Sequence, residues 1–174
     1  MSTIKRIILF GLLTASFLAH AAPVPKGLVS LPGAAAPMLK LKDSDGKETE
    51  LAKLRGQWVL VHFWASWCGP CRKEMPTLQR LSQKIPATTL RLVLVNTAES
   101  DDEVFSFLAT IAPELNSLMD RDGKVTEVWQ PRGLPSSFLV DPQGRLRYLA
   151  LGGREWDSAA YLTFIRAITA SLAR

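Results

Sequence analysis

The sequence has too few metal-ligating and thiol side chains for several common classes of small protein. It contains two cysteines and two histidines, and one of the histidines, His20, lies in the first 21 residues, which we expect to be removed. Three such side chains then remain, whereas a structural zinc site takes about four ligands and a disulfide-stapled scaffold takes several cysteine pairs. Zinc sites built from several histidines and cysteines are therefore excluded, and so is a fold held together by disulfides. The net charge of +5 is spread along the chain without long runs. A nucleic-acid-binding protein normally concentrates its basic residues in a stripe, so we expect no nucleic-acid partner.

The sequence also has no internal repeat and no sign of a second folded unit. Its 174 residues are 47% hydrophobic, which suits one packed domain with at most a short appendage. We predict a signal peptide at residues 1–21, a lead-in segment at residues 22–35 and a single domain at residues 36–174.

The first 21 residues have the three parts of a secretory signal. Lys5 and Arg6 precede a 12-residue apolar run at residues 7–18, and an Ala-His-Ala cleavage site follows at residues 19–21. Because a membrane span takes about 20 apolar residues, this run is short for a membrane anchor, which favours a cleaved signal peptide over a retained one. The sequence predicts export to the periplasm, an oxidising compartment.

A buried strand, a helix and a second buried strand follow one another in the middle of the chain. The apolar run at residues 58–64 is typical of a strand covered on both faces. Helical spacing of apolar residues continues to about residue 84, and residues 90–95 predict the second strand. Strand, helix and strand in this order form a right-handed crossover between parallel neighbours.

The remaining segments complete an α/β fold with a central mixed sheet and helices on both faces. Ser100 and Glu103 form a capping box at the start of a helix. The apolar stripe of that helix is expected at Val104, Phe105, Leu108 and Ile111. The other predicted elements are a small N-terminal hairpin around residues 39–46, a short helix at 124–129, an antiparallel hairpin of residues 137–140 and 145–151, and a final helix capped by residue 157 or 158.

The two cysteines are separated by two residues, in Cys68-Gly-Pro-Cys71, and lie between the first buried strand and the helix that follows it. At the start of a helix, unpaired backbone N–H groups and the helix dipole favour the thiolate of Cys68, and the thiolate is the nucleophile. Cys71 lies one turn further along and is close enough to attack a mixed disulfide formed at Cys68. Pro70 fits the first helical turn, and Gly69 allows a partner chain to approach closely. The pattern predicts a redox-active disulfide between Cys68 and Cys71.

The segment around the cysteines resembles the active site of thioredoxin. This resemblance is carried by Trp67-Cys-Gly-Pro-Cys71 and by Val61-His-Phe-Trp-Ala65 before it. From about residue 36 to residue 168, the fuller pattern is similar to that of TlpA/ResA-type exported thiol-disulfide oxidoreductases of the thioredoxin superfamily. The other matching segments are Ala36-Pro37, Asp45-Gly46-Lys47, Leu54-Arg-Gly56, Arg72-Lys-Glu-Met-Pro76 and Gly133-Leu-Pro-Ser-Ser-Phe-Leu-Val-Asp141. The resemblance implies a thioredoxin-like fold with an N-terminal β-hairpin extension. It also implies reversible exchange with protein substrates that have cysteine pairs, with no bound cofactor.

The resemblance also implies roles for residues around the cysteines. Spacing alone favours an exposed Glu74, but the family often has a buried glutamate at this position, and such a carboxylate with a raised pKa can accept a proton from Cys71. Leu134 and Pro135 match the family's cis proline, beside which the backbone of Leu134 can pair with an extended substrate. Trp67 is expected to cover the sulfurs. The predicted substrate-binding residues are Trp67, Gly69, Pro70, Leu134 and Pro135.

His62 is the clearest departure from thioredoxins, which have an aspartate at this place in the strand. A buried histidine in a strand is more often neutral and hydrogen-bonded than catalytic. We expect the same of His62.

Other uses of the cysteine pair remain open in the sequence. A structural disulfide that closes so short a loop gains little chain entropy. The alternative function is a copper chaperone with Cys68 and Cys71 as its ligands. Copper chaperones of similar fold carry a C-x-x-x-C motif and a later histidine, whereas this spacing is shorter and no histidine follows Cys71. A peroxidase is disfavoured because peroxidatic cysteines lie in a different local motif.

We expect the protein to act as a reductant of disulfides. The Gly-Pro dipeptide between the cysteines resembles that of reducing members of the superfamily. A reductant in an oxidising compartment must itself be re-reduced, which implies a thiol electron donor at the membrane. By family analogy, the expected substrates are the haem-binding cysteines of apocytochrome c or the cysteines of a copper site. The protein is expected to be a monomer.

Overall fold

The structure, a computed structural model, describes residues 22–170. The predicted signal peptide and the last residues of the chain lie outside the described residues. In chain order the elements are β1 (Leu28–Ser30), β2 (Lys40–Lys42), β3 (Glu48–Glu50), the 3-10 helix η1 (Leu51–Leu54), β4 (Trp58–Trp64), α1 (Gly69–Lys84), β5 (Leu90–Thr97), α2 (Asp101–Ile111), β6 (Ser117–Asp120), α3 (Lys124–Trp129), β7 (Ser136–Val140), β8 (Leu146–Leu151) and α4 (Ala159–Thr169).

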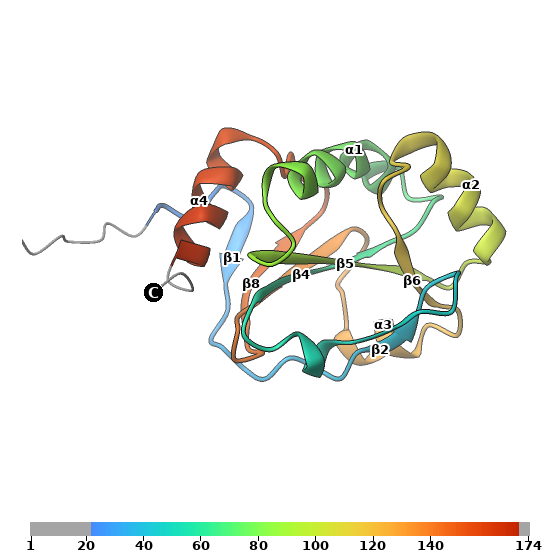
Figure 1. The fold of residues 1–174 in the computed structure, drawn as a ribbon, viewed down its shortest axis with the longest axis horizontal. Coiled ribbons are helices and arrows are strands. Elements are labelled where there is room, and N and C mark those ends of the chain that lie inside the picture. The colour runs from blue at the N-terminus through green and yellow to red at the C-terminus, as the bar shows by residue number, and fades with distance from the viewer. Residues whose placement is uncertain (1–21, 171–174) are drawn as a thin grey trace, which may run out of the picture.

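Six strands form one mixed sheet in the order β1-β8-β7-β4-β5-β6. β4 and β5 are parallel and are joined by α1, whereas β7 is antiparallel to both β4 and β8. α1, α2 and α4 pack on one face of the sheet, and α3 packs with the β2–β3 hairpin on the other (Figure 1). The predicted mixed sheet with helices on both faces and an N-terminal hairpin is confirmed.

The central strand β4 leads directly into the cysteines, and all 7 of its residues are buried. Its side chains alternate between two apolar clusters, as the pleat of a strand requires. Leu60 and Trp64 pack with the side chains of α1 and α2, whereas Val61 and Phe63 pack with those of α3. His62 shares the alternation of Leu60 and Trp64. Its side chain therefore lies on the α1 side of the sheet.

The start of α2 is as predicted, but its buried face is not. Both halves of the capping box are present: the Ser100 N–H donates to Glu103 Oε2 at 2.9 Å, and the Glu103 N–H donates to Ser100 Oγ at 3.4 Å. The prediction that Phe105 lies on the apolar stripe is wrong, because Phe105 is 69% exposed and Phe107 is 7% exposed. A stripe through Val104 continues at positions three and four residues further on. This spacing selects Phe107 and leaves Phe105 on the flank of the helix.

Two short strands at the edges of the sheet were not predicted. β1 lies within the predicted lead-in segment and pairs antiparallel with β8, and β6 pairs parallel with β5 at the opposite edge. The segment around β1 is further held by hydrogen bonds: the Tyr161 hydroxyl donates to the Lys26 carbonyl at 3.2 Å, and Arg154 Nη2 donates to the Gly27 carbonyl at 3.1 Å. Residues 22–35 therefore contribute an edge strand to the sheet.

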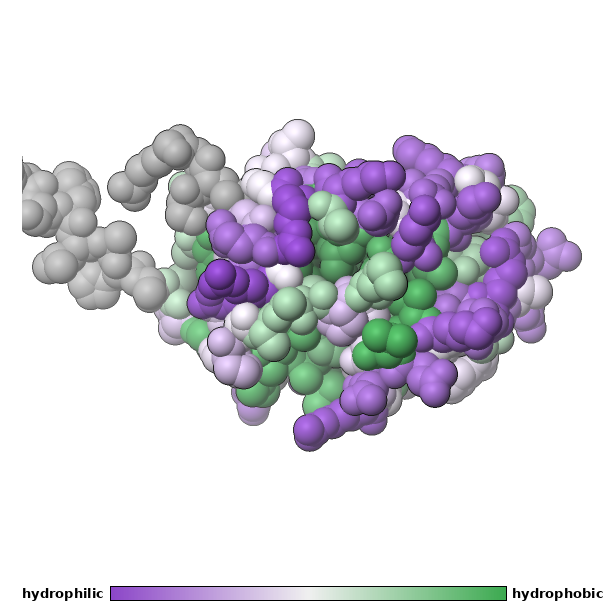
Figure 2. Space-filling model, turned by 90° about the horizontal axis from the view of Figure 1, so that it is seen from below, coloured by the Kyte–Doolittle hydropathy of each residue, from purple (hydrophilic) through white to green (hydrophobic). Residues whose placement is uncertain are grey.

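Exposed apolar side chains lie on the face of the molecule opposite α1. Figure 2 shows this face, where apolar groups reach the surface near the middle and hydrophilic groups border them. Met38 and Val128 are 82% and 59% exposed. They belong to this side because Trp129 of α3 donates its Nε1–H to the Met38 carbonyl at 3.2 Å. Within residues 22–170, no helix is both long enough and apolar enough to cross a membrane.

Candidate active site

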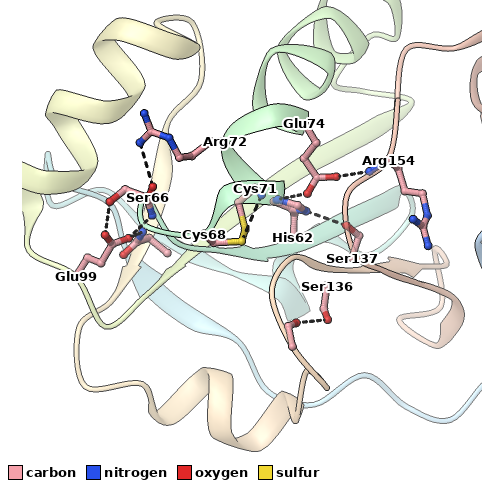
Figure 3. Close-up of a disulfide and its surroundings, with 12 residues drawn as sticks. His62, Ser66, Cys68, Cys71, Arg72, Glu74, Glu99, Ser136, Ser137 and Arg154 are labelled. Atoms are coloured by element: carbon pink, nitrogen blue, oxygen red, sulfur yellow. Dashed lines mark hydrogen bonds and ion pairs between the residues drawn. A yellow bond between two sulfur atoms is a disulfide. The ribbon is translucent and has the colours of Figure 1, made fainter.

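The two cysteines form a disulfide at the junction of β4 and α1 (Figure 3). Their Cα atoms are 5.2 Å apart. Cys68 is the N-cap residue of α1, and the backbone N–H of Cys71 donates to Cys68 Sγ at 3.3 Å. Cys68 is 5% exposed, whereas Cys71 is 0% exposed. Among residues 22–170, no group of three or more histidine, cysteine, aspartate or glutamate side chains is placed to hold a metal ion.

The turn before Cys68 is held by side chains that sequence reasoning missed. Glu99, which follows β5, accepts hydrogen bonds from the Ser66 N–H at 2.7 Å and from Asn96 Nδ2 at 2.6 Å, and it also accepts one from the Ser66 hydroxyl. Arg72 Nη1 donates to the Ser66 carbonyl at 3.1 Å. Because β4 and β5 are parallel, both strands end on the same side of the sheet, close to the cysteines. The polar residues directly after β5 were therefore the one signal in the sequence that could have indicated the contact with Ser66. Glu99 and Arg72 fix the turn from two sides.

Glu74 is buried on the side of α1 that faces the sheet, with 3% of its surface exposed. Its Oε2 accepts hydrogen bonds from the Arg154 N–H at 2.8 Å and from Trp156 Nε1–H at 3.2 Å. Burial raises the pKa of Glu74 to about 7, although these hydrogen bonds and the charge of Arg154 act to lower it. The burial and raised pKa that the family resemblance implied are therefore present. The carboxyl group can take up or release a proton near neutral pH.

His62 on β4 lies between Glu74 and Ser137 (Figure 3). Its Nε2 is 3.3 Å from Glu74 Oε1, and its Nδ1 is 2.8 Å from Ser137 Oγ on β7. The His62 side chain is 0% exposed, and this burial lowers its pKa to about 3. The ring is therefore neutral near pH 7, and its contact with Glu74 is not a charged pair. The expectation of a neutral, hydrogen-bonded histidine is confirmed.

Three of the predicted substrate-binding residues border the disulfide at the start of α1. Trp67 is 70% exposed, and Gly69 and Pro70 are exposed in the first turn of the helix. A Cβ on Gly153, in the loop after β8, would lie 3.3 Å from the Pro70 carbonyl oxygen. This loop therefore packs closely against the first turn of α1.

The other two predicted substrate-binding residues lie in the loop before β7. The Leu134–Pro135 peptide bond is cis, as the family resemblance implies. Ser136 of β7 pairs with Phe63 near the end of β4. Pro135 therefore lies close to the point where β4 leads into the active-site turn. The Pro135 carbonyl accepts a hydrogen bond from the Gly152 N–H at 2.8 Å, whereas the backbone of Leu134 has no such partner among the described residues.

Known proteins match the chain in family, sequence and fold. The model of the AhpC/TSA family matches residues 32–149. The thiol-disulfide oxidoreductase ResA of Bacillus subtilis is 32% identical over 120 residues, which cover 69% of this chain and 67% of ResA. The crystal structure of a thiol:disulfide interchange protein DsbE from Chlorobium tepidum matches with a TM-score of 0.71 and 31% identity, covering 79% of this chain and 96% of that one. StoA from Bacillus subtilis matches with a TM-score of 0.63 and 26% identity, covering 75% of this chain and 98% of StoA.

The mixed sheet and the cysteine pair at a strand–helix junction define a thioredoxin-like thiol-disulfide oxidoreductase. The chain belongs to the AhpC/TSA family, whose model matches more than half of its length. Within that family it is similar to the ResA and DsbE oxidoreductases. The resemblance to TlpA/ResA-type enzymes and the predicted enzyme class are confirmed.

Proposed function

We propose that this enzyme reduces disulfides in exported proteins through the Cys68 and Cys71 dithiol. The observation that carries this proposal is the different placement of the two cysteines. Cys68 caps α1 and receives a backbone N–H on its sulfur, whereas Cys71 is fully buried behind it. A donor directed at the Cys68 sulfur stabilises its thiolate, and the thiolate is the attacking form.

The exchange moves two electrons from the protein to its substrate. The Cys68 thiolate attacks one sulfur of a substrate disulfide, forms a mixed disulfide and releases the first substrate thiolate. The Cys71 thiolate then attacks Cys68 Sγ, which closes the Cys68–Cys71 disulfide and releases the second substrate thiolate. Each released thiolate takes up one proton. A dithiol donor must then reduce the Cys68–Cys71 disulfide before the next turnover.

Glu74 is the proposed proton acceptor for Cys71. It lies three residues beyond Cys71 on α1, and both side chains are buried between this helix and the sheet (Figure 3). A carboxylate whose pKa is raised to about 7 is better matched to a thiol proton than an ordinary glutamate is, because proton transfer is efficient when the two pKa values are close.

The proposed substrate-binding surface surrounds the sulfur of Cys68. Trp67 supplies an exposed apolar side chain, and the unpaired backbone of Leu134 can form hydrogen bonds with an extended substrate segment. Pro135 positions this loop beside the cysteines, and the small first turn at Gly69 and Pro70 leaves room for the incoming chain.

We place this activity in the periplasm, with residues 1–21 as a signal peptide, residues 22–35 as the segment that leads into the domain, and residues 36–174 as the domain itself. The electron donor is then a membrane thiol protein that passes reducing equivalents outward. Cysteine pairs of apocytochrome c or of a copper site are the proposed substrates by family analogy. The proposed working form is a monomer.

Alkylation of the reduced protein tests which cysteine attacks. After reduction with dithiothreitol and its removal, iodoacetamide should modify Cys68 first, with a rate that rises through a single pKa below the value of about 8.5 of an ordinary cysteine. Peptide mapping identifies the alkylated residue at each pH.

Cys68→Ser is the matched control, and its remaining thiol should react slowly at every pH below 8. First modification of Cys71 near pH 7 would overturn the assignment of Cys68 as nucleophile. Tight binding of one copper ion per chain after anaerobic purification, without exchange activity, would favour the chaperone function instead.

A further inference from the structure

The contact between Glu74 and His62 leaves two buried polar atoms facing each other. Glu74 Oε1 and His62 Nε2 are 3.3 Å apart, and neither atom has a hydrogen bond to any other described residue. Two lone pairs in this position would repel, and a buried polar atom without a hydrogen-bond partner destabilises the folded state. One proton between the two atoms satisfies both. The question is which atom carries it.

The other atoms of the two side chains restrict the answer. Glu74 Oε2 already accepts two N–H groups, from Arg154 and Trp156, so it acts only as an acceptor. A proton on this carboxyl group is therefore best placed on Oε1, where it points to His62. On the far side of the ring, Nδ1 meets the hydroxyl of Ser137. A hydroxyl group can donate or accept, so Ser137 can pair with either tautomer of His62.

Two arrangements leave every one of these atoms paired. In the first, Glu74 is protonated, its Oε1–H donates to His62 Nε2, and the ring donates its Nδ1–H to Ser137 Oγ. In the second, Glu74 is a carboxylate, the ring donates Nε2–H to Oε1, and the Ser137 hydroxyl donates to Nδ1. The ring is neutral in both. The first arrangement holds one proton more than the second, and the charge changes by one unit on Glu74 alone.

We propose that His62 is a positioning residue whose tautomer follows the charge on Glu74, so that Oε1 keeps a hydrogen-bond partner in both the acid and the carboxylate forms. The inference deepens the proposed role of Glu74 as the proton acceptor for Cys71 and rests on it for its functional meaning. When the pair accepts one proton from the Cys71 thiol, the sulfur gains the negative charge that Glu74 loses. After this uptake the neutral ring holds its proton on Nδ1 instead of Nε2, and the Ser137 hydroxyl accepts a hydrogen bond from the ring where it donated one before.

Other charged and titratable groups near Glu74 belong to the elements packed around it. Arg154, in the loop after β8, carries the nearest positive charge, and Tyr161 of α4 feels the charge of Glu74. Cys71 lies on the same helix. In the disulfide form the cysteines do not titrate, and burial holds the pKa of Tyr161 above its ordinary value of 10, so its hydroxyl stays protonated below pH 9. A change of His62 between pH 5 and 9 in this form therefore reports on Glu74.

Nuclear magnetic resonance of the oxidised, full-length chain tests the proposal. His20→Gln leaves His62 as the one histidine in the sequence, so the ¹⁵N shifts of its ring report one tautomer equilibrium. We expect the Nδ1–H tautomer at pH 5 and the Nε2–H tautomer at pH 9. The midpoint should coincide with the ¹³C titration of the Glu74 carboxyl carbon, near the Glu74 pKa of about 7.

Two variants complete this test. Glu74→Gln should remove the pH dependence of the tautomer, because the side chain no longer titrates. Glu99→Gln changes another buried glutamate, which contacts Ser66 and Asn96, and should leave the tautomer change in place. The proposal is overturned if His62 keeps one tautomer while Glu74 titrates. It is also overturned if the signal of a protonated, charged His62 ring appears at any pH from 5 to 9. Because no substrate is present, failure here is separate from failure of the exchange function.

Discussion

Replacement of Cys71 by serine should convert the enzyme into a trap for its own substrates. Cys68 keeps its position at the start of α1, so it can still form a mixed disulfide. The buried thiol that resolves this intermediate is missing. A Cys71→Ser variant expressed with its own N-terminal segment should therefore accumulate covalent complexes, at least tenfold above wild type, that dissociate on addition of dithiothreitol. Electrophoresis under non-reducing and reducing conditions measures them.

The matched control is Cys68→Ser, which retains one thiol but places it at a fully buried position. It should trap far less protein than Cys71→Ser does. Mass spectrometry of the trapped partners separates a cytochrome c route from a copper-site route. Equal trapping by both single variants, or none by either, would contradict the assignment of Cys68 as the attacking thiol.

Replacement of Glu74 by glutamine should stabilise the oxidised protein at alkaline pH relative to acid pH. The folded-state pKa of Glu74 is raised from 4.5 to about 7, so the folded protein binds more protons than the unfolded chain between these values. Stability linked to Glu74 therefore falls as the pH rises through this window and stays low above it. The difference corresponds to about 3 kcal/mol. A glutamine cannot titrate, so this loss is absent from the variant.

Urea unfolding of both proteins at pH 4.5 and pH 9 measures this effect. The free energy of unfolding of the variant, minus that of wild type, should be more positive by about 3 kcal/mol at pH 9 than at pH 4.5, which means that the variant is relatively more stable at pH 9. The low pKa of His62 makes wild type less stable as the pH falls below 6.5, and we expect a similar loss in the variant. Glu155→Gln, at an exposed position, should show a difference within about 0.5 kcal/mol. If the difference in unfolding free energy between Glu74→Gln and wild type did not change with pH, the pKa of Glu74 would not be raised by folding, and the prediction would be wrong.

The strand–helix–strand unit and the cysteine pair can be predicted from the sequence because their signals are local. The seven consecutive buried residues at Trp58–Trp64 form an apolar run that only His62 interrupts. The C-x-x-C spacing that follows is rare without a redox use. The capping box at Ser100 is local as well. The edge strands β1 and β6 have 3 and 4 residues, too few for a periodic pattern, and are defined by the strands beside them.

The proton-binding part of the site depends on contacts between distant segments. Spacing alone made Glu74 a surface residue, because its burial comes from Arg154 and Trp156, which lie 80 and 82 residues further along the chain. In the sequence, His62 is only a departure from a family pattern. Its contact with Glu74 depends on how α1 packs against β4 and therefore could not be predicted. Glu99 was missed for the same reason. Its partner Ser66 is 33 residues away and belongs to another loop.

The central claim is that the Cys68–Cys71 disulfide is a reversible redox couple, and its reduction potential tests that claim most directly. The oxidised protein is equilibrated with dithiothreitol buffers of graded ratio, quenched with acid, and its free thiols are labelled and counted by mass. We predict one reversible two-electron transition within the range of about −270 to −120 mV spanned by thioredoxin and its oxidising relatives, near the reducing end. A disulfide that resists reduction until well below about −300 mV, as structural disulfides do, would contradict the account.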